Sequence, residues 1–310
     1  MNPRYILVLL FMCVSTYAYA DDAYDCAKSS GDTQINACTR GIESGHWQGA
    51  NLGAAYDNRG NAKKNKGDFD GAIADYNRAI ELNPQDAGAY NNRGIAKKNK
   101  GDLDGAIADF NRAIELNPRL SEAYNNRGNA KKNKGDLDGA IADYNRAIEL
   151  NPQDADAYSN RGNAYYYQGN FAHAGADLAH AYELDPDIYT ALWLYLAQSR
   201  NGSKGKNELI KNVASLDTSK WPAPIVALYL GTGTPSTVFS AVENPDAQTR
   251  KDQRCEANFY VGSWQLLKGD RKQALSSLRA ARDGCPKTFI EYTGAVYELK
   301  RLGMLARSKN

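Results

Sequence analysis

The sequence predicts an all-α protein, a solenoid of paired helices, from three observations. Compared with itself at an offset of 34 residues, the chain aligns "AYDNRGNAKKNKGDFDGAIADYNRAIELNPQD" with two near-identical copies and a fourth, looser one. A period of this length is typical of helical solenoids. In each copy a first stretch of helical periodicity stops at a glycine, and a second stops at Asn-Pro or Asp-Pro. Glycine after one helix and proline after the next are expected of a helix–turn–helix unit.

The period also sets the expected organisation of the chain. We predict four repeats, over residues 53–86, 87–120, 121–154 and 155–188. A degenerate helical cap is expected over residues 21–52, and degenerate repeat-like helices over residues 189–310. A position within a repeat is called a place, so that Gly53, Ala87, Ser121 and Ala155 each occupy place one.

Four places carry the same kind of residue in every repeat. Place four is tyrosine, place eight glycine, and places twenty and twenty-seven alanine. This pattern resembles the tetratricopeptide repeat, which implies stacked helical hairpins that bind protein or peptide partners. The small residues let antiparallel helices approach closely, while the aromatic residues fill the gaps between them. The residues are Tyr56, Tyr90, Tyr124 and Tyr158; Gly60, Gly94, Gly128 and Gly162; Ala72, Ala106, Ala140 and Ala174; Ala79, Ala113, Ala147 and Ala181.

The carboxy-terminal half has a second, narrower resemblance. The order "LWLYLA", "WPAPIVALYLG", "NFYVGSWQLLKGD" and "FIEYTGAVYEL" is similar to that of the bacterial envelope repeat lipoproteins called new lipoprotein I. The resemblance implies a non-enzymatic adaptor that is a possible homodimer. The alternative is an outer-membrane lipoprotein that regulates cell-wall hydrolases or their proteolysis. The chain departs from that family in its three near-identical repeats and in lacking a long acidic tail.

The first twenty residues are typical of a secretory signal. A basic start at Arg4 is followed by an apolar run and by "AYA" ending at Ala20. The run spans about ten residues, too short for a membrane helix of about twenty, and we expect no membrane span elsewhere. We therefore expect a secreted protein, periplasmic by the resemblance. The alternative is a lipoprotein acylated on Cys13, but Met12 stands before it, where that processing needs a small side chain.

Cleavage at that point leaves four cysteines, an even number in an oxidising compartment. In the repeat frame Cys38 lies on a second helix whose antiparallel mate carries Cys26, and Cys255 begins a helix whose partner ends before Cys285. An antiparallel hairpin brings such positions together. We predict the disulfides Cys26–Cys38 and Cys255–Cys285; free buried thiols are the alternative.

Charge and motifs give no sign of an enzyme or of nucleic-acid binding. Lysine and arginine total 38 against 36 acidic residues, and residues 53–154 hold sixteen of each sign. The three histidines, His46, His173 and His180, have no metal-ligand spacing. We expect no cofactor, no metal, no catalysis and no nucleic-acid partner.

Helical spacing places one row of asparagines on the concave side of the repeats. An amide offers both a donor and an acceptor, so such a row can pair with successive peptide groups of an extended chain. The row resembles the asparagine ladder in the repeats of the enzyme that transfers N-acetylglucosamine to nuclear proteins. The alternative is that duplication copied surface asparagines without a role. The residues are Asn58, Asn92, Asn126 and Asn160 at place six and Asn61, Asn129 and Asn163 at place nine, where Ile95 is the exception.

The segment "AKKNKGD" occurs in three repeats and becomes "AYYYQGN" in the fourth. We interpret the lysines as a solvated charged face whose place-twelve members, Lys64, Lys98 and Lys132, reach the groove. Places two and five lack the cations of a clamp for a carboxy-terminal dicarboxylate. In the fourth repeat we expect Tyr166 and Tyr167 to face the groove as a binding centre. The alternative is that they pack against the helices that follow.

Overall fold

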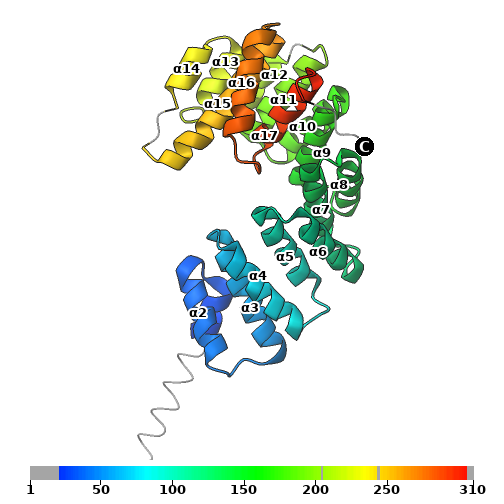
Figure 1. Ribbon diagram of the computed structural model, residues 1–310, viewed down its shortest axis with the longest axis vertical. Helices are drawn as coiled ribbons and strands as arrows, with labels where there is room; N and C mark the ends of the chain where they lie inside the picture. The colour runs from blue at the N-terminus through cyan, green and yellow to red at the C-terminus, as the bar shows by residue number, and fades with distance from the viewer. Residues whose placement is uncertain (1–20, 204, 243–244, 306–310) are drawn as a thin grey trace, which may run out of the picture. The chain divides into compact units, whose positions relative to one another are not determined.

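The computed structural model describes residues 21–203, 205–242 and 245–305, and the regular secondary structure of these residues is helical throughout. Successive helices run antiparallel and pack in pairs (Figure 1). The prediction of an all-α fold made of paired helices is confirmed. The expected signal sequence and Cys13 lie outside the described residues.

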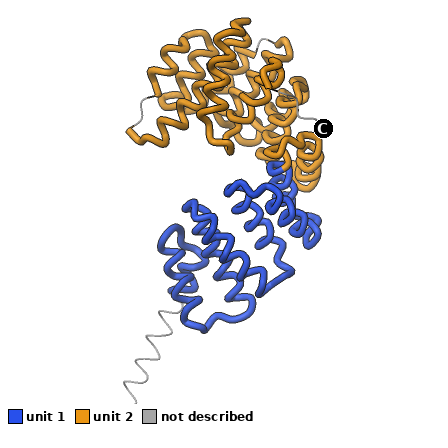
Figure 2. The backbone as a smooth tube through the Cα atoms, viewed as in Figure 1, with its two compact units in different colours: residues 1–130 blue, residues 131–310 orange. Residues whose placement is uncertain are grey.

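The chain divides into two compact units, residues 1–130 and 131–310, coloured separately in Figure 2. Unit 1 begins with a helix over residues 21–28. Its further helices are α2 (Gly31–Glu43), α3 (Gly49–Asn65), α4 (Phe69–Leu82), α5 (Ala87–Lys100) and α6 (Leu103–Leu116). Helix α7 (Ser121–Lys134) continues into unit 2, which holds α8 (Leu137–Leu150), α9 (Ala155–Gln168), α10 (Phe171–Leu184), α11 (Ile188–Arg200), α12 (Lys206–Val213), α13 (Ala223–Leu230), α14 (Pro235–Ser240), α15 (Ala247–Leu267), α16 (Arg271–Gly284) and α17 (Ile290–Arg301).

The turn between the two helices of a repeat follows from two residue types. In the second repeat, Gly101 follows α5 with a φ of 94°, a backbone conformation that residues with a Cβ rarely adopt. Asp102 then caps α6, and its side chain accepts a hydrogen bond from the Gly105 N–H. The glycine and aspartate of "KGD" therefore make the turn that begins the second helix of the first three repeats, and Gly169 with Asn170 makes it in the fourth.

Close approach of the paired helices needs glycine at place eight. A Cβ at Gly94 would lie 2.7 Å from the Phe110 ring, which is fully buried between the helices. Alanines at places twenty and twenty-seven, such as Ala106 and Ala113, are also fully buried. The core of unit 1 thus consists of small residues packed around one ring per repeat.

A charged cluster spans each hairpin. In the second repeat, Arg93 donates to both oxygens of Asp109 at 2.6 and 2.9 Å, and Lys97 contacts the same carboxylate at 2.8 Å. Arg93 also donates to Asn77 Oδ1 of the preceding repeat at 2.7 Å and lies over the Tyr90 ring. Asp109 is 4% exposed. The cluster therefore links two helices of one repeat to the repeat before it.

The same cluster recurs along the chain and corrects the interpretation of the lysines. The place-eleven lysine is not part of a solvated face, because it is half-buried against the aspartate at place twenty-three. The place-fourteen lysine is exposed and pairs with an aspartate of the preceding repeat, as Lys100 does with Asp70. The recurring pairs are Arg59–Asp75 with Lys63, Lys131–Asp143, and Arg161–Asp177, in which Tyr165 replaces the lysine.

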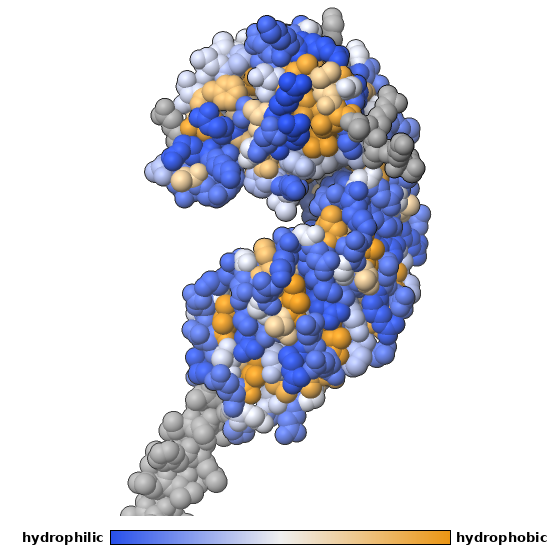
Figure 3. All heavy atoms as spheres, viewed as in Figure 1, coloured by the Kyte–Doolittle hydropathy of each residue, from blue (hydrophilic) through white to orange (hydrophobic). Residues whose placement is uncertain are grey.

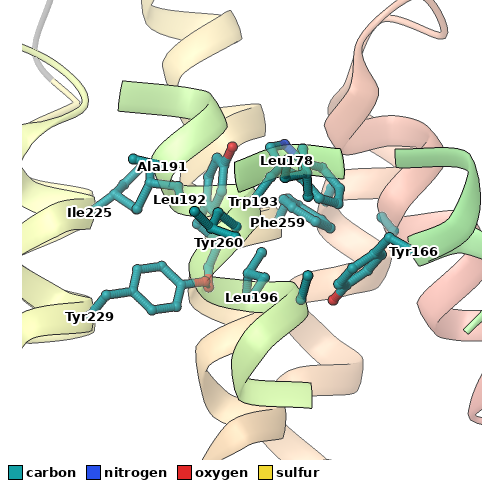
Figure 4. Close-up of a cluster of buried hydrophobic side chains, with 14 of the residues drawn as sticks. Tyr166, Leu178, Ala191, Leu192, Trp193, Leu196, Ile225, Tyr229, Phe259 and Tyr260 are labelled. Carbon is teal, nitrogen blue, oxygen red and sulfur yellow. The ribbon is translucent and has the colours of Figure 1, made fainter. Parts of the chain in front are cut away.

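Unit 2 has a much larger apolar core. Trp193 and Phe259 stack with ring centroids 5.1 Å apart, and Figure 4 shows them between Tyr166 on one side and Tyr229 on the other. Helices α15 and α16 form a full-length hairpin, whereas α12, α13 and α14 are shorter. The core of this unit joins side chains from α8 to α17.

Both predicted disulfides are confirmed. Cys26 is bonded to Cys38 across the first hairpin, and Cys255 to Cys285 across the α15–α16 hairpin. Within the described parts of the chain, no helix is both long enough and apolar enough to cross a bilayer.

We predict that Asp109→Ala lowers the free energy of unfolding by about 3 kcal/mol, because Arg93 and Lys97 then stay half-buried without their carboxylate. Urea unfolding followed by circular dichroism measures the change. Glu115→Ala, which breaks an exposed pair with Arg112, is the control and should cost less than about 1 kcal/mol. Equal effects of the two substitutions would contradict a structural role for the buried cluster.

Candidate functional site

The candidate site is one face of unit 1, made by the first helix of each repeat. We call it the first-helix face and define it by the side chains at places five, six, nine and twelve. All of these side chains are half-buried and so remain accessible in part. Figure 3 shows that hydrophilic residues predominate on the visible side of unit 1, with small hydrophobic patches between them. The residues are Asp57, Asn58, Asn61 and Lys64; Asn91, Asn92, Ile95 and Lys98; Asn125, Asn126 and Asn129.

Hydrogen bonds donated by place-six asparagines connect successive first helices across this face. Asn92 Nδ2 donates to Asp57 Oδ1 at 3.1 Å, and Asn126 Nδ2 donates to Asn91 Oδ1 at 3.1 Å. An asparagine amide has two N–H donors and one carbonyl acceptor, so such a bond uses one of its three hydrogen-bonding groups. The amides of Asn92 and Asn126 are thus fixed in orientation and keep capacity for a ligand.

At place nine the asparagine serves the fold. Asn61 Oδ1 accepts hydrogen bonds from Tyr76 at 2.9 Å and from Lys64 at 3.2 Å, while its amide donates to Asp57. The second repeat has Phe110 in place of that tyrosine, and Ile95 packs there against the same cluster as Phe110. The exception in the asparagine row is therefore a matched pair of apolar residues. Comparing places nine and twenty-four in the sequence could have revealed it.

In the fourth repeat the prediction of an accessible place-nine asparagine is wrong. Asn163 is 3% exposed, and its Oδ1 has no hydrogen-bond partner among the described residues. Leu178 occupies place twenty-four, from which Tyr76 of the first repeat donates to the place-nine asparagine. A Cβ at Gly162 would lie 2.9 Å from the Leu178 side chain. The expected ladder does not extend through this position.

The place-twelve lysines differ from one repeat to the next. Burial lowers the pKa of Lys64, and the charge of Asp57 acts in the opposite direction. Burial also lowers the pKa of Lys98, and the charge of Lys64 lowers it further. Lys132 is 6% exposed and donates to Asn160 Oδ1 at 3.2 Å, so the expectation that it reaches an open groove is wrong.

The prediction that Tyr166 and Tyr167 face a groove is also wrong. They are 1% and 3% exposed, because α17 packs against α9. Tyr166 donates to Glu298 Oε1 at 3.0 Å, and Tyr167 donates to the backbone oxygen of Ile290 at 3.1 Å. The Tyr167 ring stacks on Tyr297 at a centroid distance of 5.2 Å. The two tyrosines hold the last helix, while Tyr165 is half-buried beside the same core.

Two acidic side chains near the start of α17, the buried Glu291 and the half-buried Glu256, accept hydrogen bonds from aromatic side chains. Tyr260 donates to Glu291 Oε1 at 3.2 Å, while Tyr189 and Trp221 donate to Glu256 Oε2 at 2.9 and 2.7 Å. Burial raises the pKa of Glu291 to about 7, and the charge of Glu256 acts in the same direction. Among the residues that the structure describes, no cluster of three histidine, cysteine or acidic side chains could hold a metal ion.

Comparison with known families identifies the repeats. A family model described as "TPR repeat" matches residues 60–101, 98–135 and 128–169, and one described as "Tetratricopeptide repeat" matches residues 155–188. Residues 60–188 are therefore tetratricopeptide repeats, and the resemblance inferred from places four, eight, twenty and twenty-seven is confirmed. The resemblance to new lipoprotein I stays a prediction.

Solved structures of such proteins are similar to parts of this chain. MamA is 28% identical over 50% of this chain and 90% of its own, with a TM-score of 0.45. The first TPR of Spaghetti (RPAP3), bound to the HSP90 peptide SRMEEVD, is 26% identical over 40% of this chain and 99% of its own, with a TM-score of 0.38. YrrB, described as a TPR protein with an unusual peptide-binding site, is 20% identical over 73% of this chain and 97% of its own, with a TM-score of 0.43.

We predict that Tyr167→Ala destabilises unit 2 by about 3 to 5 kcal/mol, because it leaves a cavity beneath α17. Urea unfolding followed by tryptophan fluorescence reports the loss, since Tyr167 touches Trp193. Tyr24→Ala removes a ring that is 67% exposed and should change stability by less than about 0.5 kcal/mol. A Tyr167 variant as stable as the Tyr24 variant would show that α17 does not depend on this contact.

A second prediction concerns pH. The pKa of Glu291 is higher in the folded protein than its ordinary value of 4.5, so folding is favoured while Glu291 is protonated and weakens as pH rises toward 7. The loss between pH 5 and pH 8 is up to about 3 kcal/mol. Glu291→Gln should remove this dependence from urea unfolding curves, whereas the exposed Glu115→Gln should retain it. An unchanged slope in the Glu291 variant would assign the pH dependence to other groups.

Proposed function

We propose that the protein is a non-enzymatic scaffold that binds extended segments of partner proteins along the first-helix face of unit 1. The observation that carries this proposal is the row of half-buried place-six amides, Asn58, Asn92 and Asn126, which recur once per repeat, and of which Asn92 and Asn126 are oriented by hydrogen bonds to the preceding first helix. Peptide groups of an extended chain offer alternating donors and acceptors. A row of amides can satisfy both without reading the side chains of the ligand.

The hydrogen bonds of Asn61, at place nine, hold neighbouring side chains of this face in position. Asn61 is held by Tyr76, Lys64 and Asp57, so the neighbouring first-helix side chains have little freedom to lose when a ligand binds. Binding to oriented groups costs less side-chain entropy than binding to mobile ones. The first-helix face therefore suits a ligand that gains its affinity from main-chain hydrogen bonds.

The cell envelope is the compartment that we propose for this scaffold. Two disulfides suit an oxidising compartment, and the first twenty residues have the pattern of an export signal. A periplasmic adaptor accommodates both features. The alternative function, a lipoprotein that regulates cell-wall hydrolases or their proteolysis, predicts a lipid on Cys13, which mass spectrometry of the mature amino terminus tests. The possible homodimer is tested by light scattering.

We predict that Asn58→Ala, Asn92→Ala and Asn126→Ala together weaken partner binding about a hundredfold, since each hydrogen bond contributes about 1 kcal/mol. Crosslinking in the native envelope identifies the partner, and titration of the purified pair gives the dissociation constant. The control replaces Asn83, Asn117 and Asn151, which are exposed and follow the second helix of the first three repeats. Equal affinity of the two triple variants, both folded by circular dichroism, would refute the proposed site.

A further inference from the structure

The three lysines of "AKKNKGD" have different environments. The place-eleven and place-fourteen members of the second repeat, Lys97 and Lys100, are paired with Asp109 and Asp70. The ammonium of Lys98, at place twelve, has no hydrogen-bond or ion-pair partner among residues 21–203, 205–242 and 245–305, although the side chain is half-buried. The sequence thus keeps a cation at a place where the fold supplies no anion.

The surroundings of Lys98 make this cation costly. A partly buried charge without a partner loses solvation and gains no attraction in return. Its charged neighbour is a second cation, Lys64, whose ammonium is bonded to the neutral amide oxygen of Asn61. The only carboxylate defined as part of the first-helix face, Asp57, accepts hydrogen bonds from Asn61 and Asn92. A side chain without charge would cost less in the unbound protein, so the pair of lysines points to an anionic ligand.

We propose that Lys64 and Lys98 together bind a carboxylate of the peptide that lies on the first-helix face, so that the preferred partner segment is acidic. This inference rests on the proposed function. Two lysines and Asp57 leave one positive charge in excess, which a single carboxylate balances. A lysine ammonium accepts a carboxylate as a point charge with three donors, so no planar arrangement of the ligand is needed.

The site is confined to the first two repeats. In the fourth repeat, place twelve is Tyr166, which is buried beneath α17. In the third repeat, Lys132 is buried and bonded to Asn160. Place twelve therefore serves the ligand in the first two repeats and the fold in the third and fourth, where Lys132 and Tyr166 are buried.

The test selects random twelve-residue peptides by phage display on the full mature chain. We expect peptides enriched in aspartate and glutamate, and loss of that enrichment for the double variant Lys64→Met, Lys98→Met. The control, Lys66→Met with Lys100→Met, removes the same charge from the same two turns at exposed places and should keep the enrichment. Binding of a selected peptide should weaken at least tenfold in the first double variant, whose thermal midpoint should not fall.

Each outcome of this test has a defined meaning. Replacing the glutamate of the peptide by glutamine, or amidating its carboxy terminus, shows which carboxylate is bound. Selected peptides without acidic enrichment, or equal loss in both double variants, overturn the inference and leave the peptide-binding function intact. A stronger preference for phosphoserine than for glutamate also overturns it. Failure to select any peptide contradicts the proposed function and the inference together.

Discussion

The packing of the repeats depends on the contacts of the arginine at place seven. It reaches a buried aspartate on the second helix, an asparagine of the preceding repeat and the tyrosine of its own helix, as Arg93 does with Asp109, Asn77 and Tyr90. The interior around it is mostly alanine and glycine, which allow close helix packing but fix its register weakly. A bidentate arginine–carboxylate pair supplies that register, because its geometry tolerates little displacement.

Once the arginine and the place-eleven lysine are committed to this cluster, only a few places of the first helix remain for a ligand. At place six, Asn92 is oriented by a hydrogen bond to the first helix of the preceding repeat. At place nine, Asn61 is oriented by a hydrogen bond from Tyr76. At place twelve of the second repeat, Lys98 carries a charge that no side chain among the described residues pairs with. In unit 2 the same helical surface is used differently, because Tyr166 and Tyr167 of α9 are covered by α17. One repeat geometry therefore gives the proposed binding face in one unit and a core in the other.

Much of the fold could be predicted from the sequence because its determinants are local and periodic. The 34-residue period and the glycine that ends each first helix follow from spacing, and both disulfides follow from where the repeat frame places the cysteines on antiparallel helices. The burial of Tyr167 could not be predicted, because its partner Ile290 lies 123 residues further along the chain, where the period is lost. The prediction of a solvated lysine face was wrong for another reason. The sequence pattern places the place-eleven lysine on the surface, and only the structure shows that it pairs with the buried Asp109. At the candidate site, the role of Ile95 could have been predicted from the sequence, because the second repeat also replaces the tyrosine at place twenty-four with Phe110.

Hydrogen–deuterium exchange on the purified protein, alone and saturated with a bound partner, tests the central claim most directly. The account predicts added protection in α3 and α5, residues 49–65 and 87–100, with no change in α9 and α17, residues 155–168 and 290–301. Added protection confined to α9 and α17 would contradict it, because the ligand would then occupy the surface that the last helix covers.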